Sequence, residues 1–342
     1  MNSNEKLEGN IFKFFKNLDC ILIINTNIKD PNFFYFSGLK GLFEYDILII
    51  TRKNTVLLAS PLEFENALSQ KKIKVVKKVK NSLFLRRSVK SKKIGFNGSF
   101  LPTALYHQIK RKYKPKRMVD ISKTLEKIRV VKTKNEVEKI KKAVEITKKA
   151  FEKIPSFFKA GVSEKQLAEV FDRLLLELGS EENAFKTIVA FGKNSASPHH
   201  EPGNSKLKKG DLILIDAGAK FEGYCSDLTR MFTFGEIKKN REKIKSMFNC
   251  VEETRKSILA SLKPGVEFKE ITKIFENTLK KKGFKPLHSF GHSIGVEVHE
   301  PLPRKLKKGV VLAIEPGVYT ENVGGVRIED DFLITENGPV EL

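Results

Sequence analysis

The C-terminal part of this 342-residue chain contains an internal repeat, which constrains the fold more than any other feature. Residues 160–179 (AGVSEKQLAEVFDRLLLELG) align with residues 264–283 (PGVEFKEITKIFENTLKKKG). Further on, residues 200–218 align with residues 299–317 through the shared strings HEP and KLKKG. Each half therefore predicts a helix, a Gly-Val turn, a second helix closed by glycine, a linker and a β-hairpin. A pseudo-twofold axis would place both hairpins side by side in one antiparallel sheet, with the helices on one face.

The preceding residues show a different pattern and indicate a separate, smaller domain. From residue 11 to about 120, short β-rich runs such as ILIIN and TVLLA alternate with helical stretches, which is typical of an α/β domain. A helix then opens at Thr133, where Thr133 and Glu136 form a capping box. We place the boundary at residue 124, giving an N-terminal α/β domain (1–124) and a C-terminal α+β domain (125–342).

Charge and hydropathy limit the class of protein. The formal charge is +23, from 64 Lys and Arg against 41 Asp and Glu, a balance that suits a nucleic-acid binder. Because lysine recurs on nearly every polar helix face, we expect a solvated surface and no nucleic-acid partner. The segment Lys71–Lys80 predicts a strand with one solvated face. No run is apolar enough to span a membrane, and three scattered cysteines fit a reducing compartment, so we expect a cytoplasmic protein with no membrane partner.

Four carboxylates occupy related positions in the repeat. Asp216 and Glu315 each follow an apolar strand, and Asp227 and Glu329 lie on the returning strand of each hairpin. Four such groups cannot share a buried site unpaired, because like charges at close range force protons onto some of them. Bound cations resolve this repulsion, and two divalent ions would balance four negative charges.

Histidine gathers in the same linkers. The chain has six histidines, and four of them, His199, His200, His292 and His299, fall in the two linkers. His292 lies between glycines that allow close backbone approach and is the better ligand candidate. Oxygen ligands with one imidazole suit Mn²⁺, Co²⁺, Fe²⁺ or Zn²⁺, whereas the cysteine spacing does not suit a structural zinc site.

Through these residues the chain resembles the pita-bread metallopeptidases, in particular their Xaa-Pro dipeptidase and aminopeptidase P branch. The resemblance is carried by the stretches FKTIVAFGKNSASPHHEP, IDAGAKFEGYCSDLTRMF, GHSIGVEVHEP, IEPGVY and GGVRIED. It covers residues 125–342, and the stretch NFFYFSGLKG (32–41) extends it to a creatinase-type N-terminal domain.

The resemblance implies a role for each matching residue. Asp216, Asp227, His292, Glu315 and Glu329 would hold two divalent ions, Mn²⁺ or Co²⁺ first and Zn²⁺ or Fe²⁺ next, with Asp227 and Glu329 as bridges. Glu315 would also move a proton between the attacking water and the departing proline nitrogen. His199 and His299 would polarise the scissile carbonyl. The internal repeat pairs His200, not His199, with His299, which keeps His200 as the second choice.

Substrate contacts and assembly are implied in the same way. Phe185, His200, Arg327 and Arg304 would contact substrate or orient ligands, with Arg304 as a clamp for the proline carboxylate. The implied activity is cleavage of the bond before a proline in short peptides by a homodimer, with dipeptides favoured. Cleavage of longer peptides by an Xaa-Pro aminopeptidase is the alternative, and an inactive peptide-binding scaffold is a remote one. The apolar stretch 32–43 would be core or would line a partner's cleft.

Overall fold

The computed structural model describes residues 15, 17–78 and 83–342. It divides into two compact units, Met1–Ile128 and Arg129–Leu342, so the division lies close to the expected boundary at residue 124. Among the residues described, every helix is too short or too polar to traverse a lipid bilayer.

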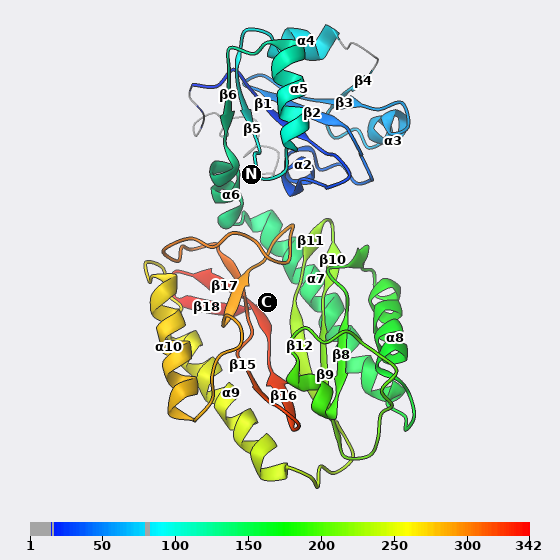
Figure 1. Ribbon diagram of the computed structural model, residues 1–342, viewed down its shortest axis with the longest axis vertical. Helices are drawn as coiled ribbons and strands as arrows, with labels where there is room; N and C mark the ends of the chain where they lie inside the picture. Colours follow the sequence, from blue (N-terminus) through cyan, green and yellow to red (C-terminus); the bar gives the residue numbers. More distant parts are fainter. Residues whose placement is uncertain (1–14, 16, 79–82) are drawn as a thin grey trace. The chain divides into compact units, whose positions relative to one another are not determined.

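A mixed six-stranded sheet in the order β4-β3-β2-β1-β5-β6 organises the N-terminal unit (Figure 1). The β1–β2 and β2–β3 pairs are antiparallel, whereas β1–β5, β3–β4 and β5–β6 are parallel. The elements are β1 (Cys20–Ile24), α2 (Pro31–Ser37), β2 (Ile47–Thr51), β3 (Thr55–Ala59), α3 (Phe64–Ser69), β4 (Lys74–Lys77), α4 (Leu83–Val89), β5 (Lys93–Phe96), α5 (Thr103–Tyr113) and β6 (Arg117–Asp120).

Both faces of this sheet are buried, which explains the continuous apolar runs. Along β1, Ile21 and Ile23 enter one core cluster, while Cys20, Leu22 and Ile24 enter another, because successive side chains of a strand point to opposite faces. The expected strand in the segment 71–80 is β4; Val79 and Lys80 lie outside the described residues.

The apolar stretch 32–43 is mostly core. Phe33, Phe36 and Phe43 are buried in one cluster, whereas Leu42 is 60% exposed. The core interpretation therefore accounts for most of this stretch, and Leu42 alone offers a large apolar side chain to solvent.

Two repeated halves build the C-terminal unit. Its elements are α6 (Ser122–Val130, which begins in the first unit), α7 (Lys134–Lys153), η1 (Ile154–Phe157), α8 (Glu164–Glu177), β7 (Glu182–Asn183), β8 (Ile188–Phe191), η2 (Gly192–Ala196), β9 (Asp211–Ala217), β10 (Ala219–Phe221), β11 (Tyr224–Cys225), β12 (Leu228–Phe234), α9 (Arg241–Ser261), α10 (Phe268–Lys281), β13 (Gly291–Ser293), β14 (Val311–Ile314), β15 (Gly317–Thr320), β16 (Gly324–Arg327), β17 (Asp330–Thr335) and β18 (Gly338–Glu341). Helix α8 flanks the strands of the first half and α10 those of the second (Figure 1). The expected capping box is present at Thr133 and Glu136, where α7 begins.

The Gly-Val turns of the repeat have the same geometry in both halves. Gly161 and Gly265 have φ values of 85° and 93°, in the left-handed region that glycine occupies without strain. The Gly161 N–H donates to the Leu207 carbonyl at 2.9 Å, and the Gly265 N–H donates to the Leu306 carbonyl at 2.9 Å. Each turn is thereby joined to its own KLKKG string, which fixes the linker that carries the histidines.

The hairpins are divided among four small sheets instead of the single sheet expected from the repeat. The strand orders are β11-β10-β7 and β12-β9-β8 in the first half and β13-β14-β17-β18 and β15-β16 in the second. The sheets of β12 and β17 meet at one isolated bridge between Thr229 and Glu329. At this junction the Arg230 guanidinium donates to the carbonyls of Thr229 and Glu329, at 3.0 and 2.7 Å. The Thr229 carbonyl also accepts from the Glu329 N–H at 3.3 Å, so a side chain and the backbone share this acceptor.

The repeat predicts equal stability losses at its two buried phenylalanines. Phe171 on α8 and Phe275 on α10 are 0% and 1% exposed, so each change to Ala should lower the free energy of unfolding by about 3–5 kcal/mol, because apolar burial is removed and a cavity is left. Urea unfolding followed by circular dichroism, with hydrogen exchange of α8 and α10 peptides, measures both.

Leu176→Ala is the matched control on α8, because Leu176 is 53% exposed and its truncation should cost within about 0.5 kcal/mol. A Phe171→Ala protein as stable as the control would contradict this assignment of the core.

Candidate active site

The repeat delivers its acidic side chains to one place. Asp216 lies on β9 and Glu315 follows β14, while Asp227 and Glu329 immediately precede β12 and β17. His292 is the middle residue of β13. Each acid therefore stands at or beside a strand end, at the junction between the two sheets.

Three of these side chains lie close enough together to share one cation. Ligand atoms of Asp227, His292 and Glu329 all lie within 4.8 Å of one another. The His292 Nε2 atom is 3.4 Å from Asp227 Oδ2, 3.8 Å from Glu315 Oε1 and 3.9 Å from Glu329 Oε1. The structure thus brings three of the predicted acidic ligands to within 3.9 Å of the imidazole nitrogen of a fourth, His292.

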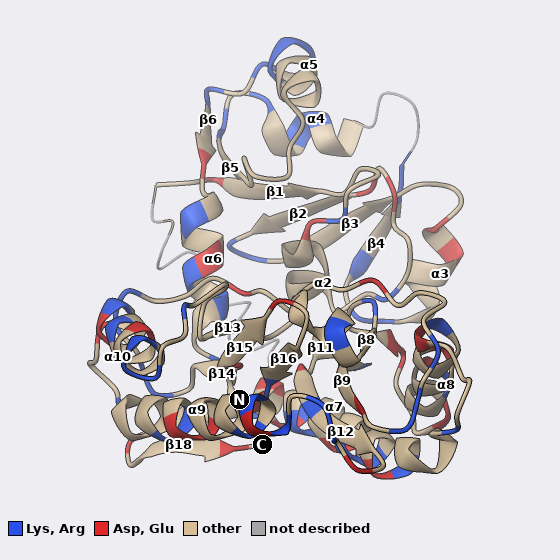
Figure 2. Ribbon diagram, turned by 60° about the horizontal axis from the view of Figure 1, so that its bottom comes forward, with Lys and Arg blue, Asp and Glu red and all other residues tan. Residues whose placement is uncertain are grey.

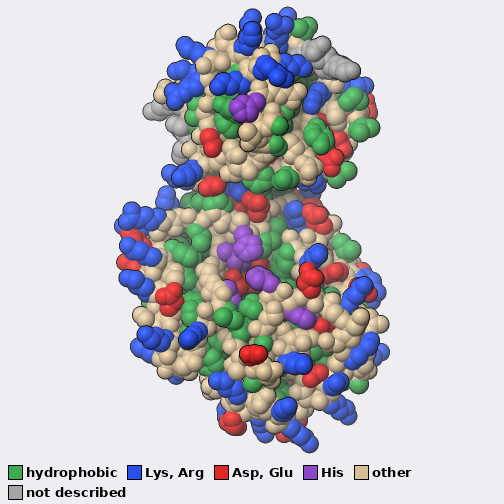
Figure 3. Space-filling view, viewed as in Figure 1, with side chains coloured by type: hydrophobic (Ala, Val, Ile, Leu, Met, Phe, Trp, Pro, Cys, Tyr) green, Lys and Arg blue, Asp and Glu red, His purple; other side chains and the backbone are tan. Residues whose placement is uncertain are grey.

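A cavity of about 1230 Å³ opens onto this cluster. All five predicted ligands line it, together with His199, His200, His288 and His299. Figure 3 shows His side chains gathered with Asp and Glu in a hollow on the visible face of the C-terminal unit. His199 and His299 are exposed, whereas Asp227 and Glu329 are buried. The acids form the floor and the exposed histidines are open to an incoming molecule.

The electrostatics of the floor are dominated by burial and like charge. Burial raises the pKa of Asp227 and of Glu329 well above their ordinary values, and neighbouring carboxylates raise both further. Burial likewise raises the pKa of Glu315 to about 8, with Arg327 opposing the shift and Asp216 adding to it. Burial lowers the pKa of His292 to about 4, helped by repulsion from His299, so this imidazole stays in its neutral, metal-binding form.

Carboxylate oxygens that lack hydrogen-bond partners indicate that this cluster of side chains suits cations. Asp216 Oδ1 and Asp227 Oδ1 are buried and have no hydrogen-bond partner among the described residues. A buried carboxylate oxygen without a donor is costly, and a divalent cation removes both that cost and the repulsion between the acids. Oxygen donors with one imidazole therefore fit the divalent ions expected from the sequence.

Arg327 holds the floor in place. Its guanidinium donates to Asp216 Oδ2 at 2.6 Å, to Thr229 Oγ1 at 3.0 Å and to Tyr319 Oη at 2.9 Å. The Thr229 hydroxyl in turn donates to Glu329 Oε2 at 2.6 Å. The Arg327 guanidinium thus contacts Asp216 directly and Glu329 through Thr229; the ligand-orienting role that the resemblance implies for Arg327 stays a prediction.

Sequence reasoning missed His288 and Tyr319. His288 Nδ1 donates to its neighbour's carbonyl, the Ser289 oxygen, at 2.7 Å, so Nε2 accepts from the Tyr319 hydroxyl at 2.8 Å. Burial lowers the pKa of His288 to about 4. This histidine is one of only six in the chain and lies just before the GHS string, a signal that could have marked it.

A buried glutamate fixes the linker of the first half. Glu164 is 0% exposed; its carboxylate accepts from Phe191 N at 2.8 Å and Gly203 N at 3.1 Å, and lies 2.9 Å from His200 Nε2. His200 is therefore engaged by Glu164, whereas the adjacent His199 is exposed. The assignment of His199, the choice from family spacing, or of His200, the choice from the repeat, stays a prediction.

Another buried glutamate fixes the linker of the second half. Glu300 Oε2 lies 3.3 Å from Arg129 Nε, and Glu300 Oε1 accepts from Val296 N at 3.1 Å. A Cβ at Gly295 would come within 2.9 Å of Glu300 Oε1, so any larger residue there would require the Glu300 carboxylate to shift. These contacts of Glu300 set the path of the chain between His292 and His299, whose ring centroids are 4.2 Å apart.

Two of the predicted substrate contacts differ in their placement. Phe185 lines the cavity, half-buried. Arg304 is not among the lining residues; it is 83% exposed and lies 3.3 Å from Glu267 in the turn of the second half. Its role as a clamp for a carboxylate stays a prediction to which the single chain adds no support.

Comparisons with known proteins agree with this geometry. The family description "Metallopeptidase family M24" matches residues 138–336, and "Creatinase/Prolidase N-terminal domain" matches residues 15–131. An Xaa-Pro dipeptidase of Pyrococcus horikoshii is 36% identical over 349 residues, covering 99% of this chain and 97% of that protein.

Solved structures give the same result. The crystal structure of the prolidase from Pyrococcus horikoshii has a TM-score of 0.87 at 33% identity and covers 100% of this chain and 97% of its own. That of an X-Pro aminopeptidase from Thermotoga maritima has a TM-score of 0.85 at 30% identity and covers 95% of each chain. With its repeat, its acidic floor and these matches, the chain belongs to metallopeptidase family M24.

Proposed function

We propose that this chain hydrolyses the peptide bond between a first residue and a following proline, with Xaa-Pro dipeptides as the favoured substrates. One observation carries the proposal: a single cavity joins five potential metal ligands to the exposed histidines His199 and His299. The Pyrococcus horikoshii relative with that activity matches both units of the chain.

Asp216, Asp227, His292, Glu315 and Glu329 would hold two divalent cations, Mn²⁺ or Co²⁺ first. Lewis-acid activation of water and of the scissile carbonyl is the chemistry that such a pair supplies when bound. In this arrangement Arg327 and Thr229 keep the Asp216 and Glu329 carboxylates oriented, since outer partners of this kind tune ligand geometry.

Glu315 is the proposed proton carrier. It is half-buried at the cavity, and its Oε1 atom lies 3.8 Å from His292 Nε2. As the water oxygen bonds to the carbonyl carbon, Glu315 accepts the water proton. When the C–N bond breaks and its electron pair returns to nitrogen, the same proton passes to the proline nitrogen.

His199 and His299 are the proposed donors to the carbonyl oxygen. Each comes from the linker of one half, so the two linkers face a substrate between them. Hydrogen bonds to the oxygen strengthen as it gains negative charge in the tetrahedral intermediate. Selectivity for proline would come from a wall shaped for the ring, with Phe185 as part of it, and from an acid placed to protonate an imide nitrogen.

Longer substrates are the alternative, because the Thermotoga maritima structure of similar fold is described as an X-Pro aminopeptidase. Comparing kcat/KM for an Xaa-Pro dipeptide with that for the matching Xaa-Pro-Yaa tripeptide separates the two activities. A preference for the tripeptide would replace the dipeptidase assignment and keep the assignment as a peptidase.

We further propose a cytoplasmic homodimer in which the N-terminal unit of one subunit forms a wall of the other subunit's active-site cleft.

The metal centre predicts the effect of removing a bridging carboxylate. Asp227→Asn and Glu329→Gln should each lower kcat/KM by more than about 10²-fold, beyond the effect typical of an outer partner, and should lower the bound metal. Metal content by mass spectrometry and hydrolysis of an Xaa-Pro dipeptide measure both effects.

The control is Glu321→Gln, an exposed acid in the turn between β15 and β16. Full turnover by metal-reconstituted Asp227→Asn protein would contradict the assignment of Asp227 as a metal ligand.

The proposed donor role predicts a separate effect for His299. His299→Ala should lower kcat by about 10²–10³-fold, the usual cost of removing one oxyanion donor, with metal content unchanged. His200→Ala is the comparison, because His200 is engaged by Glu164 and should change kcat less. An unchanged kcat in His299→Ala would assign His299 to the structure of the loop.

The shared-cleft proposal predicts that activity depends on assembly. Light scattering should give twice the 38.9 kDa chain mass at assay concentrations, and dilution below the dimer dissociation constant should lower specific activity, because each cleft then lacks a wall. A strictly monomeric protein with full activity would refute the shared cleft and leave the peptidase assignment intact.

A further inference from the structure

The chain's positive charge is concentrated in its N-terminal unit, whereas the residues of the proposed peptidase site belong to the C-terminal unit. Residues 1–128 carry 26 Lys and Arg against 10 Asp and Glu, whereas residues 129–342 carry 38 against 31. The first unit thus holds +16 of the formal charge of +23. The expectation of no nucleic-acid partner rested on an even spread of lysine, and the spread is not even.

The imbalance comes from one continuous stretch. Residues 66–119 contain 17 Lys and Arg and no acidic residue. A lysine-rich composition alone would leave acids interspersed, as they are in the C-terminal unit. Asp and Glu are therefore absent from β4, α4, β5, α5 and most of β6, although lysine and arginine are frequent there.

The fold gathers two parts of this stretch at one end of the unit. Lys116 N donates to the Lys92 carbonyl at 2.9 Å, Ser91 N donates to the Lys114 carbonyl at 3.1 Å, and Lys93 on β5 pairs with Arg117 on β6. We call the resulting surface the basic end. Its members are Arg86, Arg87, Lys90, Lys92, Lys93, Lys110, Arg111, Lys112, Lys114, Lys116 and Arg117, of which all but Lys92 and Lys93 are exposed.

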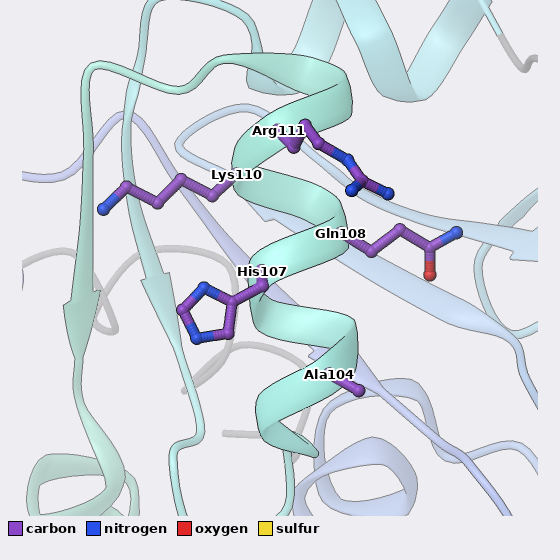
Figure 4. Close-up of a pocket in the computed structure, with 5 residues that line it drawn as sticks. All are labelled: Ala104, His107, Gln108, Lys110 and Arg111. Atoms are coloured by element: carbon purple, nitrogen blue, oxygen red, sulfur yellow. The ribbon is translucent and has the colours of Figure 1, made fainter.

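Figure 2 shows Lys and Arg along α4, α5 and β6, and Figure 3 shows these side chains crowding the end of the unit that carries α4 and α5. Figure 4 shows that α5 presents polar side chains on two flanks, with His107 and Lys110 on one and Gln108 and Arg111 on the other. These four residues, with Ala104, line a shallow hollow of about 530 Å³.

Acidic partners do not neutralise the basic end. Within the described part of the chain, no ion pair involves any of its eleven members, whereas the C-terminal unit has many, such as Lys148–Glu341 and Arg255–Asp330. Two acids of the unit have other hydrogen-bond partners than these charged groups: Asp19 accepts from the backbone N–H of Lys93, and Asp120 accepts from Ser122 and Gly98. Positive charges that lie close together make the local electrostatic potential more positive, and a positive potential attracts a polyanion.

We infer that the basic end binds the phosphate backbone of a nucleic acid, without reading its bases. Exposed Lys and Arg on adjacent elements form the electrostatic footprint of such binding. An anionic membrane is disfavoured, because surface binding to lipid also inserts apolar side chains. The apolar side of α5, with Leu105, Ile109 and Tyr113, is packed in the core, and between residues 83 and 117, all of them described, Leu83 is the only large apolar side chain that is largely exposed.

Base readout is not expected, because among residues 83–117 every aromatic side chain of Phe and Tyr is at least half-buried, and stacking on bases needs exposed rings. Binding should therefore depend steeply on salt and little on sequence. It would tether the peptidase to a polyanion, a property separate from hydrolysis and independent of the proposed substrate.

The test uses the full-length protein and a fluorescent 20-nucleotide RNA, followed by anisotropy across a salt series. Lys110→Gln, Lys112→Gln, Lys114→Gln and Lys116→Gln are combined in one variant. Removing one lysine that binds a phosphate lowers the slope of log affinity against log salt by about 1. We expect a slope lower by about 3 to 4 and an affinity at least about tenfold lower near 0.1 M salt.

A matched variant combines Lys273→Gln, Lys280→Gln, Lys281→Gln and Lys285→Gln, four exposed lysines of the C-terminal unit with no ion pair among the described residues. It removes the same net charge and should bind RNA within about twofold of the unaltered chain. Dipeptide hydrolysis should be unchanged in both variants, which checks folding.

Three results would overturn the inference: no RNA binding near 0.1 M salt, equal reductions of affinity in the two variants, or tighter binding to phosphatidylserine vesicles than to RNA. Equal reductions would mean that net charge alone acts, and preference for vesicles would reassign the basic end to a membrane surface.

Discussion

Repulsion among buried carboxylates is the constraint on which the C-terminal unit depends. Asp227 and Glu329 are almost fully buried, and Asp216 and Glu315 lie close enough to raise their pKa further. A folded chain tolerates such crowding only if some of the carboxyl groups bind protons or if opposite charge is supplied. Arg327 supplies part of the positive charge. Asp216 and Asp227 each keep one buried oxygen without a hydrogen-bond partner among the described residues, and this is why the cluster is suited to divalent cations.

The remainder of the C-terminal unit holds the acidic side chains and the cavity histidines in position. Two linkers bring histidines to the cavity, and each is held by one buried glutamate. Glu164 engages the first through backbone N–H groups and His200. Glu300 holds the second through Arg129 and backbone N–H groups. The two glutamates are not equivalent in the repeat: Phe268 occupies the position of Glu164 in the second half and stacks on Phe290, at 4.6 Å between ring centroids. The halves therefore share a backbone plan but fix their linkers with different side chains.

Charge divides the molecule as clearly as its fold does. In the C-terminal unit, negative charge is buried at a cavity and basic side chains on the surface often have acidic partners. In the N-terminal unit, basic side chains are exposed without such partners over the described residues of α4, α5 and β6. Both arrangements hold like charges together, and both are relieved by a bound species of opposite charge. The difference in burial decides the species: a small cation fits a buried floor, whereas an extended polyanion fits an exposed end.

The sequence by itself determined the repeat, the two-unit organisation and the membership of the acidic cluster, because these follow from periodicity and from residue types at related positions. The capping box at Thr133 was also readable, since capping acts within a few residues. The tertiary structure alone decided that the hairpins are divided among four small sheets, of which those of β12 and β17 meet at a single bridge. It also paired His200 with Glu164, which lies 36 residues away, and placed Arg304 outside the cavity. Contacts between distant segments depend on how side chains pack in three dimensions, and no local pattern in the chain encodes them.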